Sequence, residues 1–119
     1  MEAVKWLRLA AKQENPRALG TLGKMYATGS GVLQDDREAA RYYRLAAEKG
    51  DTDAQASLGF AYLLGQGVAK DIPQAYFWAE VAGEKAGNAA KIIKKNAAPA
   101  MTAAQIADAK RRAGDWKPQ

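Results

Sequence analysis

Two glycine-rich segments are the first candidates for chemistry, because glycine loops near basic residues can bind phosphate groups. They read GSGVLQDD at residues 29–36 and GQGVAKDI at residues 65–72. A dinucleotide-binding loop needs a preceding strand and a third glycine at a fixed spacing, and a P-loop needs the spacing G-x-x-x-x-G-K. Neither pattern is present in the sequence. We therefore interpret both segments as structural joints.

Side chains for catalysis are scarce in this sequence. It contains no cysteine and no histidine, which excludes disulfides, cysteine/histidine zinc sites and the Ser-His and Cys-His nucleophile pairs within this chain. The serines are Ser30 in a joint and Ser57 in a helical pattern. Asp35 and Asp71 lie at helix-cap positions, so no free acid/base pair remains. We predict no catalytic residue, no metal site, no cofactor and no enzymatic activity.

The two joints belong to a longer internal repeat. A shift of 36 positions aligns residues 2–47 with residues 38–83 without a gap and gives 16 identities in 46 positions. A period of this length is typical of stacked helical arrays, in which each unit buries its apolar face against the next. Frequent alanine also favours helices. We predict a single all-α domain over residues 1–119, a short α-solenoid (an α-α superhelix) of antiparallel helix pairs.

Apolar residues recur at helical spacing inside each unit. In the first complete unit they follow a 3.6-residue period, with Ala18, Leu22, Met25 and Tyr26 in one helix and Ala39, Tyr42, Tyr43, Ala46 and Ala47 in the next. Glycines mark the helix ends, and cap residues mark the starts: Asn15, Asp35, Asp51, Asp71 and Thr102, the last with Gln105 as a capping box. Together these signals predict helices over residues 2–13, 16–28, 36–49, 52–64, 72–86, 89–96 and 103–113.

Each joint combines a helix end with a helix start. Gly29 and Gly65 lie where a left-handed backbone ends the first helix of a pair, and Asp35 and Asp71 cap the second helix. Glu38 and Gln74, each three residues after its cap, are expected to complete capping boxes. The repeat divides the domain into the second helix of a truncated unit (1–14), two complete units (15–50 and 51–87) and a degenerate first helix with a closing helix (88–119).

With these positions identified, the chain resembles the Sel1-like repeat family, a subgroup of tetratricopeptide-type helical repeats. The pattern covers about residues 2–96, and its first full copy comprises Ala18, Leu22, Gly23, Tyr26, Gly29, Gly31, Val32, Asp35, Ala39, Tyr42, Ala46, Ala47 and Gly50. The resemblance implies an α-solenoid that serves as a non-catalytic adaptor or scaffold for protein or peptide partners, commonly in bacterial and eukaryotic assemblies. It does not identify the partner.

The resemblance also implies that the first helices of the pairs line a concave binding face. The contact candidates on these helices are Arg17, Lys24, Thr28, Asp53, Phe60, Leu63 and Leu64. Exposed together, the three apolar ones would mark a contact site. In the other interpretation, Phe60 and Leu63 are core residues covered by Ile92 and Ile93. Gly23 and Gly59 are expected to allow close packing against Tyr42, Tyr43 or Trp78. Trp6, Tyr42 and Trp78 are interpreted as core.

Two alternative functions start from other residues. The surplus of positive charge, a formal +5 for the chain, lies in the C-terminal segment and would suit an acidic partner surface or a nucleic acid, through Lys91, Lys94, Lys95, Lys110, Arg111 and Arg112. No stacking aromatics are interleaved with these residues, so we do not favour a nucleic acid. Some cysteine-rich members of the family have been linked to penicillin binding or β-lactam hydrolysis, which the absence of cysteine disfavours here.

The N-terminal edge suggests a third surface. The chain begins with the second helix of a pair, so Trp6, Leu9 and Ala10 are expected to lack one neighbour. We expect either that the chain is part of a longer array or that it self-associates through this edge. The sequence contains neither a recognisable signal peptide nor a run of about 18 apolar residues, and it predicts no particular compartment.

Overall fold

The computed structural model describes residues 2–119, with side chains from residue 5 onward. In this part of the chain no strand occurs and seven α-helices follow one another, which confirms the all-α prediction. They are α1 (Glu2–Lys12), α2 (Pro16–Thr28), α3 (Asp36–Glu48), α4 (Thr52–Leu64), α5 (Ile72–Ala82), α6 (Asn88–Ala97) and α7 (Ala103–Asp115). Two 3₁₀ turns, η1 (Gly83–Ala86) and η2 (Ala98–Ala100), flank α6.

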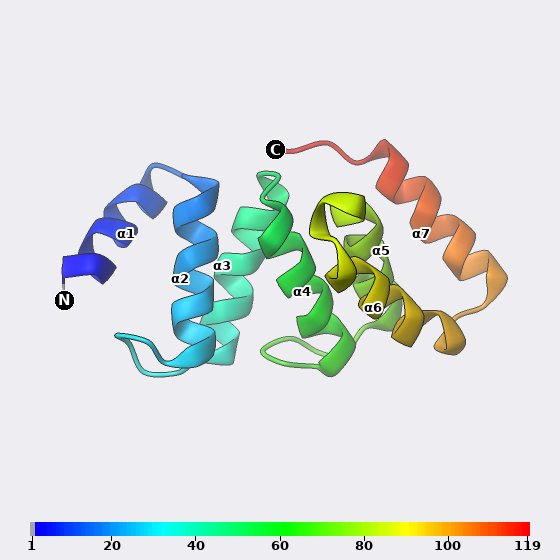
Figure 1. Ribbon diagram of the computed structural model, residues 1–119, viewed down its shortest axis with the longest axis horizontal. Helices are drawn as coiled ribbons and strands as arrows, with labels where there is room; N and C mark the ends of the chain where they lie inside the picture. The colour runs from blue at the N-terminus through cyan, green and yellow to red at the C-terminus, as the bar shows by residue number, and fades with distance from the viewer. Residues whose placement is uncertain (1) are drawn as a thin grey trace.

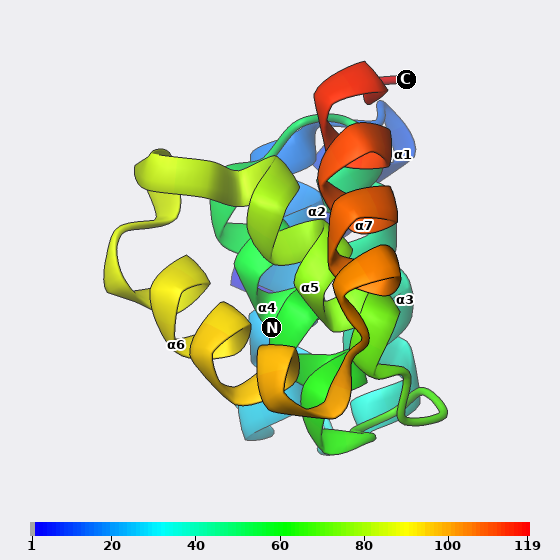
Figure 2. The same cartoon turned by 90° about the vertical axis from the view of Figure 1, so that its right-hand side faces the viewer.

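The helices stand side by side in a row that runs from α1 to α7 (Figure 1). The row measures 48 × 25 × 22 Å along its principal axes. Seen along the row, α2, α4 and α6 form one layer, here called the A layer, and α1, α3, α5 and α7 form the other, the B layer (Figure 2). Consecutive helices from α1 to α6 pack against each other, and α7 packs against α5. This arrangement is the predicted α-solenoid.

The predicted cap residues define where the helices begin. Each one accepts a hydrogen bond from a backbone N–H in the first turn: Asn15 at α2, Asp35 at α3, Asp51 at α4, Asp71 at α5 and Thr102 at α7. Gly29 and Gly65 end α2 and α4 with positive φ angles of 74° and 70°, a conformation that costs glycine little. The joints therefore end one helix and begin the next, as the sequence predicts.

The structure corrects two local details. The helix predicted over residues 72–86 ends at Ala82, because Gly83 has a φ of 58° and the chain continues as the 3₁₀ turn. The predicted capping boxes at Asp35 and Asp71 lack the return hydrogen bond to the side chains of Glu38 and Gln74. The Glu38 carboxylate instead accepts two hydrogen bonds of 2.9 Å from the guanidinium of Arg41. The box at Thr102 and Gln105 has both of its hydrogen bonds.

Removing the Asp35 cap should destabilise the array measurably. Its Oδ1 accepts from the N–H groups of Arg37 at 3.0 Å and Glu38 at 3.2 Å. We expect Asp35→Ala to lower the free energy of unfolding by about 1 kcal/mol, because these donors lose their acceptor. Asp35→Asn keeps an acceptor and should unfold at nearly the wild-type urea midpoint. Equal losses in the two variants would show that the negative charge, and not the cap, stabilises α3.

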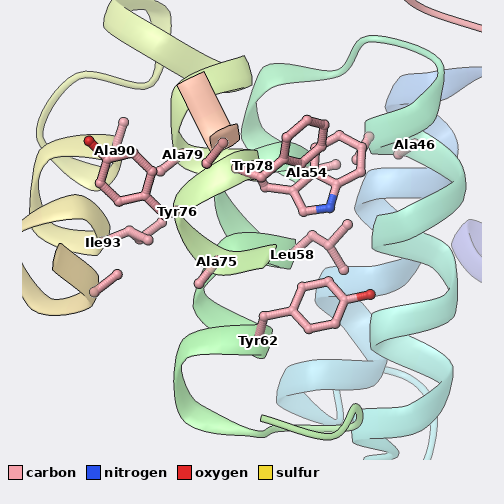
Figure 3. Packing of buried hydrophobic residues seen from close by; sticks show 14 of the residues in the cluster. Ala46, Ala54, Leu58, Tyr62, Ala75, Tyr76, Trp78, Ala79, Ala90 and Ile93 are labelled. Atoms are coloured by element: carbon pink, nitrogen blue, oxygen red, sulfur yellow. The ribbon is translucent and has the colours of Figure 1, made fainter. Parts of the chain in front are cut away.

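The core is continuous across the repeats. Leu22, Leu58 and Ile93, one from each A-layer helix, are fully buried. Small residues of the B layer, among them Ala46, Ala47, Ala75 and Ala79, have no exposed surface and allow the helices to approach closely. In Figure 3, Leu58 and Tyr62 of α4 extend toward α3, while Ile93 of α6 and Tyr76 of α5 lie on the opposite side of α5.

The units share an aromatic residue at one helix position, but this residue is not buried in every unit. Trp78 is buried, and Tyr42 is half-buried and stacks on Tyr26 with 5.7 Å between ring centroids. Trp6, in contrast, is 69% exposed, so its interpretation as core was wrong. Tyr42 obtains its stacking partner from α2, the helix before it, whereas no described helix comes before α1. Leu9 of the same predicted edge is also exposed, and Ala10 is partly exposed.

Candidate functional site

Two adjoining hollows run between α2 and α4 on the A layer. They share Tyr43 and Ser57, so we treat them as one surface, the α2–α4 groove. Its walls come from the two A-layer helices, and its floor comes from α3 beneath them. The side chains used below are Arg17, Lys24 and Ala27 of α2, Tyr43 of α3, and Asp53, Ser57 and Phe60 of α4.

The floor of the groove depends on a residue without a side chain. A Cβ atom at Gly23 would lie 2.8 Å from the ring of Tyr43, closer than carbon atoms normally approach. Glycine at this position therefore allows the Tyr43 ring to lie against α2. Burial raises the pKa of the Tyr43 hydroxyl, and the neighbouring Ser57 side chain partly offsets this rise. Tyr43 stays protonated at neutral pH and can donate or accept a hydrogen bond.

The second helical glycine confirms the same packing rule one unit later. A Cβ atom at Gly59 would lie 3.0 Å from Cδ1 of Ile93 and 3.8 Å from Cβ of Trp78. The predicted contact with Trp78 is therefore present, and Ile93 of α6 adds to it. Phe60, next to Gly59, is half-buried and packs against the core while its remaining surface lines the groove. The structure thus buries one part of the Phe60 side chain and leaves another part exposed in the groove.

The two ends of the groove differ in charge and polarity. At one end Arg17 and Lys24 of α2 face Asp53 of α4 and its cap residue Asp51, so the two walls carry opposite charges. At the other end Phe60 and four alanines form an apolar surface beside Asp36 and Gln66: Ala27, Ala39, Ala40 and Ala61. Such a surface suits a polypeptide segment that carries both polar and apolar side chains.

Four of the seven predicted contact residues line this groove: Arg17, Lys24, Asp53 and Phe60. Thr28 lies beyond the lining, where its hydroxyl donates to the Lys24 carbonyl at 3.0 Å. Leu63 packs against the core, and Leu64 is 59% exposed at the end of α4. Sequence reasoning missed Tyr43 and Ser57, although the pairing of Gly23 with a neighbouring aromatic pointed to this floor.

The predicted basic cluster is divided between two helices. Lys91, Lys94 and Lys95 belong to α6 of the A layer, and Lys110, Arg111 and Arg112 belong to α7 of the B layer (Figure 2). Several of these charges are paired: Lys94 binds Glu80 at 2.8 Å, and Arg111 binds Asp108 at 2.6 Å. The guanidinium of Arg112 also lies 5.2 Å from the ring centre of Phe77. The six residues therefore lie on two helices in different layers, and several of their charges are already paired.

Neither a cluster of metal-ligating side chains nor a membrane-spanning helix occurs among the residues that the structure describes. No group of three or more acidic, histidine or cysteine side chains is placed to hold a metal ion there. None of the helices in that part of the chain combines the length and the apolar character that crossing a bilayer requires.

Comparisons with known proteins place this fold. The sequence model of the Sel1 repeat matches residues 1–15, 17–51 and 52–86. No curated protein gives a significant match. Among solved structures, a protective antigen present in uropathogenic Escherichia coli strains, described as displaying an SLR fold, is 30% identical with a TM-score of 0.87 over 97% of this chain. A Sel1 repeat protein from Oxalobacter formigenes is 37% identical with a TM-score of 0.73 over 76% of this chain.

The chain spans only about a quarter of these two structures, since the similarity covers 26% and 27% of their lengths. Sel1 repeat proteins are generally non-catalytic scaffolds for protein interactions. The repeated matches, the joint residues and the layered helix pairs agree with one another. This chain belongs to the Sel1 repeat family.

Proposed function

We propose that this chain is a non-catalytic interaction module that binds a segment of a partner protein in the α2–α4 groove. The observation that carries the proposal is the groove between the two A-layer helices, which has opposite charges on its walls at one end and the apolar surface around Phe60 at the other. Both walls stand on helices packed against the core, so the groove is preformed and a bound segment loses little affinity to reorganisation of the module.

The groove limits the chemistry of the segment. Arg17 and Lys24 favour an acidic side chain along α2, while Asp53 favours a basic one along α4. Phe60 and the surrounding alanines favour an apolar side chain at the other end. The hydroxyl groups of Tyr43 and Ser57 can hydrogen-bond to a peptide backbone between these positions. A segment that carries an acidic, a basic and an apolar residue would satisfy all three regions.

Reversing charges in the groove should weaken partner binding. We expect Lys24→Glu and Asp53→Lys, made in separate proteins, each to reduce capture of a partner at least about fivefold. Each substitution places a charge opposite a partner residue of the same sign. Capture is measured by affinity isolation from the source cells with quantitative mass spectrometry. Both residues are exposed, so melting temperatures close to that of the wild type should confirm that the fold is intact.

The matched control is charge reversal on another A-layer helix. Lys91→Glu and Lys95→Glu change exposed lysines of α6 and should leave capture unchanged. If capture is instead lost in these two variants and falls steeply with added salt, an acidic partner or a nucleic acid binds the basic segment. That result would contradict binding in the α2–α4 groove.

A further inference from the structure

The C-terminal segment binds the array in a way that reveals a second kind of site. After α7 the chain continues as residues 116–119 across α5 to the end of α3 (Figure 1). The Trp116 ring packs edge-on against Trp78 with 6.0 Å between centroids. The Gln119 N–H donates to the Glu48 carbonyl at 2.8 Å. Pro118 lies over Gly50, 3.4 Å from the position that a Cβ atom would take.

The end of α1 repeats the backbone to which this segment binds. The N–H of Asp51 donates to the Ala46 carbonyl at 3.0 Å, and the N–H of Asn15 donates to the equivalent Ala10 carbonyl at 3.2 Å. The residues before these donors share a positive φ, 102° at Gly50 and 60° at Glu14. The 36-residue shift therefore makes the Lys12 carbonyl the repeat equivalent of the Glu48 carbonyl.

One repeat unit earlier, the surface equivalent to the site that holds the C-terminal segment is an open hollow. It lies between α1 and α3 of the B layer, and we call it the α1–α3 hollow. Tyr42, the repeat equivalent of Trp78, stands in its wall beside Tyr26 and Leu45. By the 36-residue shift, Tyr42 and the Lys12 carbonyl correspond to Trp78 and the Glu48 carbonyl, the two groups that Trp116 and Gln119 contact one unit later.

The charge of this hollow differs from that of the occupied site. Arg8, Lys12 and Arg41 line it, opposed by Glu38. The repeat equivalents of Lys12 and Arg41 are Glu48 and Phe77, so the hollow carries more positive charge than the site that holds the tail. The Arg8 guanidinium donates a hydrogen bond of 2.9 Å to the Tyr26 hydroxyl, which fixes the positive charge of Arg8 in the lining of the hollow. Charge complementarity favours an acidic ligand here.

We infer that the α1–α3 hollow binds an extended segment of a partner protein in which an aromatic residue stands next to acidic residues. The aromatic side chain would pack beside Tyr42 as Trp116 packs beside Trp78. A backbone N–H would reach the Lys12 carbonyl, and the carboxylates would lie near Arg8 and Lys12. This site is formed mainly by the B layer, so it is independent of the α2–α4 groove proposed above.

The test uses the tail sequence itself as a template for the probe. An acetylated peptide Gly-Asp-Trp-Glu-Pro-Gln keeps residues 114–119 of the chain except that glutamate replaces the lysine. We expect it to bind the full chain saturably in a fluorescence anisotropy titration. It should shift the backbone NMR signals of Arg8, Tyr42 and Leu45. The peptide with alanine in place of tryptophan should bind at least about tenfold more weakly, because stacking and burial of the indole are lost.

A repeat-matched pair of protein variants locates the binding. Arg8→Glu should weaken binding of the peptide at least about fivefold, because it replaces an attractive charge by a repulsive one. Arg44→Glu, the same change one unit later, should leave the affinity within about twofold. Absence of saturable binding, equal losses in both arginine variants, or loss only with Arg44→Glu would overturn the assignment. A dimer of the chain that Arg8→Glu dissociates would give the hollow to a second copy and also overturn it.

Discussion

Gly67→Ala is expected to lower the free energy of unfolding by about 2–5 kcal/mol. Gly67 has a φ of 75°, which an alanine adopts at a cost of about 1–2 kcal/mol. A Cβ atom there would also overlap the carbonyl oxygen of Asp36 and would lie 3.0 Å from the backbone nitrogen of Arg37. Because these are backbone atoms at the start of α3, the joint or the helix has to move, which adds about 1–3 kcal/mol.

Gly65→Ala separates the two contributions to this effect. Gly65 has nearly the same φ, 70°, but a Cβ atom there would meet only residue Lys70, with the Lys70 Cβ at 3.3 Å. It should therefore lose about 1–2 kcal/mol, the cost of the left-handed backbone alone. Urea unfolding measures both variants. If they lose the same stability, the contact between the second joint and α3 does not hold the units together.

Leu58→Ala is expected to cost about 3 kcal/mol and to lower the melting temperature by about 10 °C or more. Leu58 of α4 is 0% exposed and lies in the core that links α3, α4 and α5 (Figure 3). Truncation removes apolar contacts and leaves a cavity between packed helices, which relax only partly. Thermal unfolding followed by circular dichroism at 222 nm gives the shift.

The same helix supplies the control for this substitution. Leu64 is 59% exposed at the end of α4, so Leu64→Ala should change stability by no more than about 0.5 kcal/mol. The two variants delete the same atoms from one helix and differ in burial. Similar melting temperatures for both would mean that Leu58 is not part of a rigid core and that the repeat units unfold independently.

Much of the fold was predictable because its signals are local. Asn15, Asp35 and Asp71 are cap residues whose side chains act within one turn, and the glycines that end α2 and α4 need only their own backbone angles. The repeat then related one helix pair to the next. The end of α5 was missed because Gly83 occupies a position at which the first copy has an alanine that continues the helix.

The contacts between units were harder to predict. Position 67 requires glycine because a Cβ atom there would overlap the backbone of Asp36, which lies 31 positions away in the sequence. Nothing in the sequence near either residue signals this contact. The sequence pattern places Tyr43 among the inward-facing apolar residues of α3, and the ring is indeed partly buried. The pattern does not show that the same ring also forms the floor of the α2–α4 groove. Trp6 matches the repeat pattern, yet its side chain is exposed, because burial at this position depends on contact with a neighbouring helix.

Site-specific photo-crosslinking tests the binding surface most directly. A photoreactive amino acid replaces Ser57 in the α2–α4 groove and, in a separate protein, Lys91 on α6. Both proteins are then exposed to the partner captured by the wild type. We expect a covalent adduct with the partner from position 57 and none above background from position 91. An adduct from position 91 with none from position 57 would contradict binding in the α2–α4 groove.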